Sequence, residues 1–430
     1  MALKYWIALL FSSTYKKSDL GRRGKETLQL ALVALERKRT SQKAKEKKNN
    51  MGNIFGRIFR VMTFGESHGP ACGAVVEGMP SQIAIDLEEI QRYLDRRRPG
   101  QRFTTLRQEQ DRLEVLSGLF EGQTLGTPIA MMVRNRDQRS QDYQNLASVY
   151  RPSHGDYTWQ AKYGFRDWRG GGRSSGRETV GRVLAGALAE QFLRQWLIPN
   201  GPQPLSIVAW LEQIGPCRLQ YKEGQFEQYL QTLSRSEIDS CLARFPEASA
   251  WPQVQQLLEQ AEREGNSWGG SLVFAIRGLP AAIGEPVFDR LDAQIASALM
   301  SIPAVKGVEI GQGFQLSALS GSAANDTLQN KQGRPTLRTN RQGGIWGGIS
   351  TGGLIWGRAA FKPTPSIGLE QETLNTQLQP CNIAIKGRHD PCLAIRAVPV
   401  VEAMLAITLA DLVLSAALSN GQSAPRLQKH

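Results

Sequence analysis

The sequence lacks the cysteine pattern of a disulfide-stabilised or zinc-binding protein. Its 430 residues contain only five cysteines, an odd number, and none forms a Cys-x-x-Cys pair. Disulfide frameworks and zinc modules need paired or closely spaced cysteines, so the pattern argues against both classes and favours a reducing compartment. We therefore expect a cytoplasmic protein without a metal site.

Long apolar runs and the common nucleotide-binding motifs are also missing. The longest apolar stretches are too short for a membrane-spanning helix, so we expect no membrane association. No Gly-Lys-Ser/Thr follows the three glycines at 170–172, and no Gly-x-Gly-x-x-Gly follows a predicted strand. These absences disfavour a P-loop and a standard dinucleotide-binding fold.

Acidic residues are scarce only near the N-terminus. The formal net charge is +13, and residues 1–50 hold 13 Lys and Arg against 4 Asp and Glu, a surplus of 9. Because the remaining residues are nearly balanced in charge, we expect no nucleic-acid partner for the body of the chain. We expect a basic, disordered extension over residues 1–50, a folded catalytic domain over 51–418 and a tail over 419–430. Two alternatives stay open for the extension: an RNA-binding segment, and a transit peptide that would direct the protein to a plastid.

Patterns typical of strands and of helices are mixed along the chain without a βαβ rhythm. Apolar or alternating runs predict strands over Arg57–Phe64, Ala71–Glu77, Arg112–Leu116, Pro128–Arg134, Gly270–Arg277, Gly307–Gly311 and Ile345–Ile355. Helices are predicted from Asp86, after a capping box at Ser175–Glu178, and over Trp251–Arg263, Asp289–Ile302 and Ala397–Leu418, with Pro399 in the first turn of the last helix. Residues 200–265 are expected to be mostly helical.

Histidine is rare, and three of the four histidines lie in polar segments that contain glycine. These are His68, His154 and His389, whereas His430 is the terminal residue. Imidazole is the side chain best suited to proton transfer near neutral pH. None of the three lies on an apolar helix face, so we interpret them as candidates for acid–base chemistry.

The segment RDWRGGGRSSGRET (166–179) places three consecutive glycines between arginines. Glycines allow backbone N–H groups to turn toward an anion, and the helix predicted directly after them would point its positive end at the same place. Arg173 and Arg177 add bidentate donors for phosphate or carboxylate. Together with the basic groups at 95–102 and 134–139, this segment predicts a pocket for a small ligand with several negative charges.

Paired glycines recur in TNRQGGIWGGISTGG (339–353). Such glycines mark either the close approach of a large flat cofactor or tight packing between strands. The residues alone leave both interpretations open.

Taken together, these motifs resemble the chorismate synthase family. The matching segments span about residues 51–415 in consistent order, and they include FGESHG (64–69), DRRRPGQ (95–101), NRDQRSQDY (135–143), RPSHGDYTWQAKYGFRDWRGGGRSSGRET (151–179), SIPAVKGVEIGQGF (301–314), TNRQGGIWGGISTG (339–352), KPTPSI (362–367) and GRHDPCLAIRAVPVVEAM (387–404). The resemblance implies an α+β fold, a β-α-β sandwich with helices packed between antiparallel sheets, and a homotetramer. It also implies a lyase of the shikimate pathway. In its last step, 5-enolpyruvylshikimate 3-phosphate loses phosphate and a ring proton by 1,4-anti elimination to give chorismate, and reduced FMN is required.

The resemblance also assigns roles to residues of this sequence. His68 would protonate the departing phosphate, His154 would stabilise the reduced flavin, and Asp390, Ser67 and Ser175 would assist proton movement. Flavin contacts would come from Arg173, Ser174, Ser175, Pro303, Ala304, Gly347, Lys362, Pro363, Thr364, Pro365, Ser366 and Arg388. The anionic substrate, or NADPH as a transient reductant, would meet Arg97 and Arg102. A flavin-dependent reductase of another substrate is a further alternative, which the missing dinucleotide fingerprint disfavours.

Overall fold

The computed structural model describes residues 52–104, 110–136, 146–197, 204–385 and 390–419. Contacts divide the chain into two units, Met1–Asn53 and Ile54–His430. All described helices and strands belong to the second unit.

The first sheet has five strands, all antiparallel to their neighbours. Its order is β1 (Ile54–Phe55), β2 (Arg60–Phe64), β3 (Ala71–Glu77), β7 (Ile129–Arg134) and β4 (Glu114–Ser117). Side chains alternate between its two faces, so Val61, Ala74 and Met131 are buried whereas Met62 and Glu77 are exposed. One face of this sheet therefore belongs to the core.

The second sheet also has five antiparallel strands. Its order is β11 (Val305–Ile310), β16 (Ile355–Phe361), β10 (Gly270–Arg277), β8 (Ser206–Ile214) and β9 (Cys217–Arg218). The central strands β8 and β10 are buried along nearly their whole length. Strands that are covered on both faces carry continuous apolar runs instead of alternating ones.

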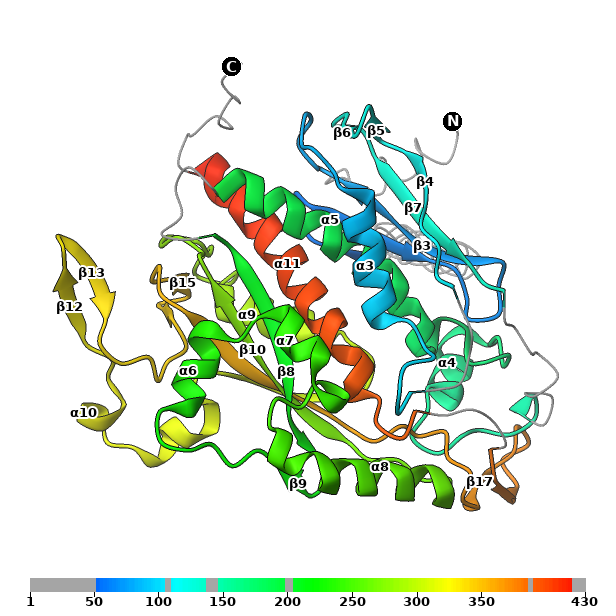
Figure 1. Ribbon diagram of the computed structural model, residues 1–430. Helices are drawn as coiled ribbons and strands as arrows, with labels where there is room; N and C mark the ends of the chain where they lie inside the picture. The colour runs from blue at the N-terminus through cyan, green and yellow to red at the C-terminus, as the bar shows by residue number, and fades with distance from the viewer. Residues whose placement is uncertain (1–51, 105–109, 137–145, 198–203, 386–389, 420–430) are drawn as a thin grey trace, which may run out of the picture. The chain divides into compact units, whose positions relative to one another are not determined.

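Helices lie between the two sheets (Figure 1). Helix α5 (Thr179–Leu197) packs against β3 of the first sheet, and α11 (Ala394–Ser419) packs against β8 of the second. The two helices cross closely at Gly186, where an added Cβ would lie 2.3 Å from the Cβ of Ala403. With α3 (Leu87–Arg97) beside α5 and α9 (Leu291–Met300) beside α11, this arrangement is the expected β-α-β sandwich and confirms the α+β class.

Shorter elements surround this framework. The remaining helices are α4 (Asp156–Tyr163), α6 (Gln225–Thr232), α7 (Arg235–Ser240), α8 (Trp251–Glu264) and α10 (Gly321–Ala324). Two-stranded hairpins pair β5 (Leu119–Phe120) with β6 (Gln123–Thr124), β12 (Leu328–Lys331) with β13 (Arg334–Leu337), β14 (Ile345–Trp346) with β15 (Ile349–Ser350), and β17 (Gln371–Leu374) with β18 (Pro380–Ile383).

Helix α11 corrects the expectation about apolar stretches. It has 26 residues and a mean hydropathy of 2.0 over its most apolar window, which is long and apolar enough to cross a membrane by length and composition alone. That window is 94% buried inside the protein, so the helix is a core element here. It also begins three residues earlier than predicted, which places Pro399 inside the helix and beyond its first turn.

Several other expectations about secondary structure were wrong in instructive ways. The strand predicted from Arg57 begins only at Arg60, because the backbone N–H groups of residues 57–59 donate to the carboxylate of Asp411, at 2.7 to 3.0 Å. The strand predicted over Ile345–Ile355 is instead the β14–β15 hairpin followed by the start of β16. The segment 200–265 contains β8, a central strand, besides its helices.

Candidate active site

His68 lies in a tight turn between β2 and β3. The N–H of Gly69 donates to the carbonyl of Glu66 (3.0 Å) and closes the turn. The Oγ atom of Ser67 lies 3.2 Å from Nδ1 of His68, and both side chains are buried. The N–H of Ser67 donates to the carbonyl of Gly172 (3.3 Å), which joins the turn to the glycine-rich loop.

The glycine-rich loop contacts both candidate histidines with consecutive residues. Gly170 has φ +61°, and a Cβ there would lie 2.3 Å from Cε1 and Nδ1 of His68. Gly171 has φ +88°, and a Cβ there would lie 2.8 Å from Cε1 and 3.2 Å from Nε2 of His154. Only residues without a side chain fit here, both for backbone conformation and for space. The two imidazoles therefore share one loop.

His154 lies beside a buried carboxylate that arginines hold in place. Its Nδ1 is 3.2 Å from Oδ1 of Asp156. Arg151 donates to both carboxylate oxygens of Asp156 (2.7 and 2.8 Å), and Arg166 adds a longer contact of 3.4 Å. Burial lowers the pKa of His154, and the opposing effect of Asp156 does not restore it. Burial opposes ionisation of Asp156, but its hydrogen bonds with Arg151 and His154 outweigh burial and lower its pKa strongly.

The residues after the glycines support the loop. Arg173 donates to the carbonyls of Thr63 (3.1 Å) and Gly65 (3.2 Å) and to the Thr63 hydroxyl (2.6 Å), so its guanidinium ties the loop to the end of β2. The Ser174 hydroxyl donates to the carbonyl of Gly171 (2.7 Å). Ser175 Oγ accepts from the N–H of Arg177 (3.3 Å) and caps a 3-10 turn over 176–178 that leads into α5. Glu178, which the predicted capping box would use, pairs instead with Thr63 and Arg182.

The segment after β16 joins the histidine loop from the other side. The N–H of Lys362 donates to the carbonyl of Ala304 (2.9 Å), next to Pro303, and its Nζ donates to the carbonyl of Ser153 (3.1 Å). Ser366 Oγ accepts from Arg151 (3.3 Å). Burial lowers the pKa of Lys362, and the nearby charge of Lys306 lowers it further. The loop that carries His154 is therefore bordered by expected flavin contacts, at 303–304 and at 362–366. The second range includes Pro363, Thr364 and Pro365.

Asp390 and Arg97 belong to a buried group of charges beside this site. Thr364 Oγ1 donates to the Asp390 carbonyl (3.1 Å), and Arg396 donates to its carboxylate (2.9 Å) and to the carbonyl of Arg97 (3.2 Å). The Arg97 side chain pairs with Asp111 (3.2 Å). Burial and the positive charge of Arg396 lower the pKa of Arg97 to about 9. Arg177 also pairs with Asp111 (2.6 Å), so Arg97 and Arg177 contact the same carboxylate.

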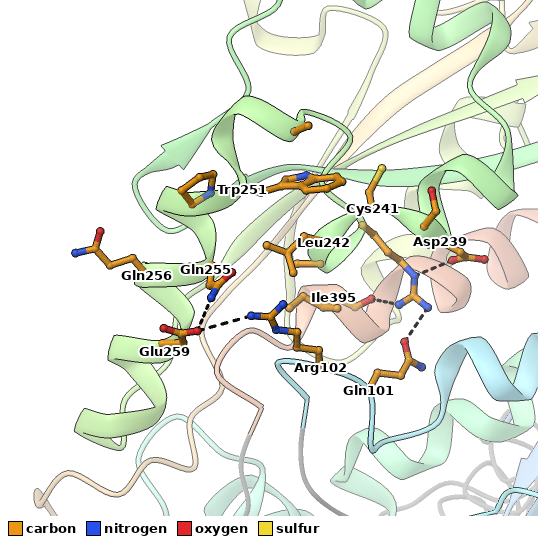
Figure 2. A pocket seen from close by; sticks show the side chains of 15 residues that line it. Gln101, Arg102, Asp239, Cys241, Leu242, Trp251, Gln255, Gln256, Glu259 and Ile395 are labelled. Atoms are coloured by element: carbon orange, nitrogen blue, oxygen red, sulfur yellow. Dashed lines mark hydrogen bonds and ion pairs between the residues drawn. The ribbon is translucent and has the colours of Figure 1, made fainter.

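Arg102 lies apart from Arg97. It lines a cavity of about 760 Å³ that is bordered by α8 and by residues 239–244. Figure 2 shows the Arg102 side chain among the residues of this cavity. Its guanidinium is 3.8 Å from Glu259, and its side chain is 59% exposed. Buried Arg244 forms part of the cavity wall and donates to the carbonyl of Ile395 (2.6 Å). The structure therefore does not bring the two expected ligand arginines into one subsite.

Gly347 is the one further expected flavin contact whose place the structure describes. Gly347 is in the turn between β14 and β15, whose neighbour is α9, and an added Cβ would meet nothing within 4 Å. Arg388 and His389 lie outside the described residues. Within the described ranges, no group of three or more His, Cys, Asp or Glu residues could hold a metal ion.

Several side-chain contacts that hold the site together were not predicted from the local motifs. Arg151 and Asp156 flank His154 in the segment RPSHGD, and this closeness in sequence was the available signal. Lys306 lies close enough to Lys362 to lower its pKa because β11 pairs with β16, a proximity that no local pattern indicates. No local pattern indicates the contact of Asn135 either. Asn135 follows β7, and its amide donates to the carbonyl of Gly69 in the His68 turn.

The fold and the site define an α+β sandwich protein with two imidazoles at one glycine loop, among buried cationic groups. The sequence model of the family described as "Chorismate synthase" matches residues 59–414. The chain is 50% identical over 368 residues to a chorismate synthase of Nostoc punctiforme, covering 85% of this chain and 98% of that protein. It is 49% identical over 365 residues to one of Cyanothece sp., covering 85% and 97%. A crystal structure of chorismate synthase matches with a TM-score of 0.66 and 30% identity, covering 84% of this chain and 93% of that one.

The chain therefore belongs to the chorismate synthase family. Enzymes of this family are lyases that catalyse the last step of the shikimate pathway, and the chain is an enzyme of this class.

Proposed function

We propose that the protein converts 5-enolpyruvylshikimate 3-phosphate to chorismate and phosphate by 1,4-anti elimination, with reduced FMN as cofactor. The observation that carries this proposal is the contact of His68 and His154 with consecutive glycines of one loop. Acid–base groups that act on one small substrate must lie within reach of the same atoms, and a shared loop places both rings on one wall.

The charges near the loop match the substrate, which carries two carboxylates and a phosphate. Arg97 and Arg177 both pair with Asp111, and Arg396 pairs with Asp390, so three guanidinium groups lie close together. Guanidinium groups form bidentate contacts with phosphate and carboxylate, and an anion would relieve their mutual repulsion. These arginines are therefore the groups that would bind the substrate, whereas Arg102 faces the separate cavity of Figure 2.

The residues present fit a flavin phosphate and ring. Burial lowers the pKa of Lys362, and the nearby charge of Lys306 lowers it further, so a bound anion would favour the charged form of Lys362. The two imidazoles occupy the space next to Gly170 and Gly171, so a flavin ring would lie beside the imidazoles. Reduced FMN supplies electron density to the breaking C–O bond and can take up the ring proton. The residues proposed to hold FMN are 173–175, 303–304, 362–366, Gly347 and Arg388.

His68 is the proposed proton donor to the departing phosphate. A phosphate leaves more readily when it is protonated, and a positioned acid typically contributes roughly 10²–10⁴ in rate. Ser67 contacts Nδ1 of the ring (3.2 Å) and would fix its orientation. The Ser175 hydroxyl and the Asp390 carboxylate are proposed to assist the movement of protons.

His154 is the proposed partner of the negative charge on the bound cofactor. Burial lowers the pKa of His154, which favours the neutral ring in the free protein. An anion beside the ring favours the protonated form. Cofactor binding should therefore raise this pKa and be accompanied by proton uptake, while Asp156 holds the ring in place.

The same proposal covers the setting of the enzyme. We propose a cytoplasmic homotetramer that acts on a small anionic substrate, with no membrane, nucleic-acid or metal partner and with NADPH as a possible reductant for the flavin. A plastid location would follow if residues 1–50 were a transit peptide.

The direct test is an anaerobic assay of the purified full chain with FMN, dithionite and 5-enolpyruvylshikimate 3-phosphate. We expect chorismate and phosphate in equal amounts, and no product when FMN or reductant is omitted. Replacing dithionite by NADPH decides whether the chain reduces its own flavin. Absence of chorismate under fully reducing conditions would overturn the proposal.

A further inference from the structure

The side-chain amide of Asn135 holds the turn that carries His68. Asn135 follows β7, and its Nδ2 lies 2.7 Å from the carbonyl of Gly69, 3.2 Å from that of Glu66 and 3.5 Å from that of Ser67. Its own N–H donates to the carbonyl of Pro70 (3.0 Å). One buried amide thus faces the carbonyls on both sides of His68.

The other end of the amide is fixed as well. Its Oδ1 accepts a hydrogen bond from Nε of Arg177 (3.0 Å), and Arg177 pairs with Asp111. Because Oδ1 faces a guanidinium that can only donate, Nδ2 must face the carbonyls, and the orientation of the amide is determined. Asn135 is only 9% exposed, so water cannot readily replace these bonds.

This position requires an amide. An aspartate would turn a carboxylate oxygen toward carbonyl oxygens in a buried site, and an alanine would leave the carbonyls without this donor. Either change would loosen the turn on the side opposite to the Ser67–Gly172 bond, which holds it from the glycine-rich loop. The His68 ring, which packs on Gly170, would then lose its fixed position.

We propose that Asn135 is a positioning residue for His68, acting through the 66–69 turn. The inference rests on the proposed function, because it assumes that His68 takes part in the reaction. A misplacement of about 1 Å at a reacting group can cost on the order of 10² in rate. The expected signature is therefore a fall in kcat, with little change in the affinity for oxidised FMN.

The test compares Asn135→Asp and Asn135→Ala with the wild type, each also in a His68→Ala background. Asn330→Asp is the matched control, since Asn330 accepts from the N–H of Gly333 (2.8 Å) in an exposed hairpin. With His68 present, we expect each Asn135 variant to lower kcat about 100-fold. In the His68→Ala background, the same substitution should lower kcat less than about threefold, because the effects of substituting residues that act as a unit are not additive. A binding titration with oxidised FMN and the thermal midpoint accompany each variant, and Asn330→Asp should match the wild type in all of them.

The outcomes separate this inference from the proposed function. Equal losses in both backgrounds would show that Asn135 acts independently of His68 and would overturn the inference, as would wild-type kcat in both Asn135 variants. Full activity of His68→Ala alone would instead refute the proposed role of His68. If Asn135→Asp fails to fold, the inference is tested with Asn135→Ala alone, by comparing the chemical shifts of its His68 imidazole with those of the wild type. Unchanged shifts would contradict the inference.

Discussion

The imidazole rings of His68 and His154 lie against consecutive glycines, although 85 residues of chain separate the two histidines. The first ring comes from the turn between β2 and β3, and the second comes from the segment that precedes α4. The glycine loop is therefore the element that converts two distant polar segments into one site.

The most direct consequence concerns Gly170. Gly170→Ala should lower kcat at least about 100-fold, because its Cβ would lie 2.3 Å from the His68 ring and the backbone has φ +61°. The matched control is Gly176→Ala in the same loop, where a Cβ would meet nothing within 4 Å. Turnover is measured anaerobically with reduced FMN. Similar activity in both variants would show that close contact at Gly170 has no functional importance.

The His154 environment predicts a dependence of stability on pH. Because the pKa of His154 is lowered by folding, the unfolded state binds more protons below its ordinary pKa of about 6.5. The free energy of unfolding should therefore fall as pH decreases through that value, by at most about 1.4 kcal/mol per pH unit from this residue. Urea unfolding at pH 7.5, 6.5 and 5.5 should show a smaller fall for His154→Gln than for the wild type. Identical falls would contradict a neutral, buried His154.

Arg151 should be important for stability as well as for the site. It pairs with the buried carboxylate of Asp156 at 2.7 Å, and its own side chain is 4% exposed. Removing one partner of a buried ion pair typically costs about 3–5 kcal/mol. Arg151→Ala should show this loss in urea unfolding. Arg60→Ala breaks an exposed pair with Glu77 and should cost less than about 1 kcal/mol. Equal costs would mean that Arg151 does not organise the His154 segment.

Residues 1–50 should be dispensable for turnover. The family match begins at residue 59, and the Cyanothece relative is covered over 97% of its length by only 85% of this chain. A variant that begins at Met51 should keep kcat and KM within about twofold of the full chain, because changes away from the core and the site usually have small effects. The same variant tests the RNA-binding alternative, which predicts a salt-sensitive RNA affinity that disappears with the deletion. A large loss of turnover would assign the extension to the catalytic unit.

Local patterns predicted those elements whose own residues determine them. Ala71–Glu77 and Gly270–Arg277 are strands with the predicted bounds, and Asp86 caps α3 as its position indicated. The strand β8 was missed because Ser206–Ile214 is a short apolar run covered on both faces, which periodicity cannot distinguish from a buried helix. The predicted strand at 345–355 failed because Gly347 and Gly348 adopt positive φ and turn the chain back.

The site was predictable to the level of segments but not of side-chain partners. Arg173 was expected to bind an anion directly, yet its guanidinium donates hydrogen bonds to Thr63 and Gly65. Arg97 and Arg102 are five positions apart in sequence, but Arg97 is buried and Arg102 lines a cavity beside α8. The direction of a side chain depends on tertiary contacts, and these partners come from distant segments of the chain.

The central claim is that His68 and His154 act on one substrate at one loop, and phosphate release in a single anaerobic turnover tests it most directly. With enzyme and reduced FMN in excess over 5-enolpyruvylshikimate 3-phosphate, the wild type should release phosphate together with chorismate. His68→Ala and His154→Ala, folded as judged by their thermal midpoints, should each be slower by roughly 10²–10⁴. Wild-type rates of phosphate release in both variants would contradict the account.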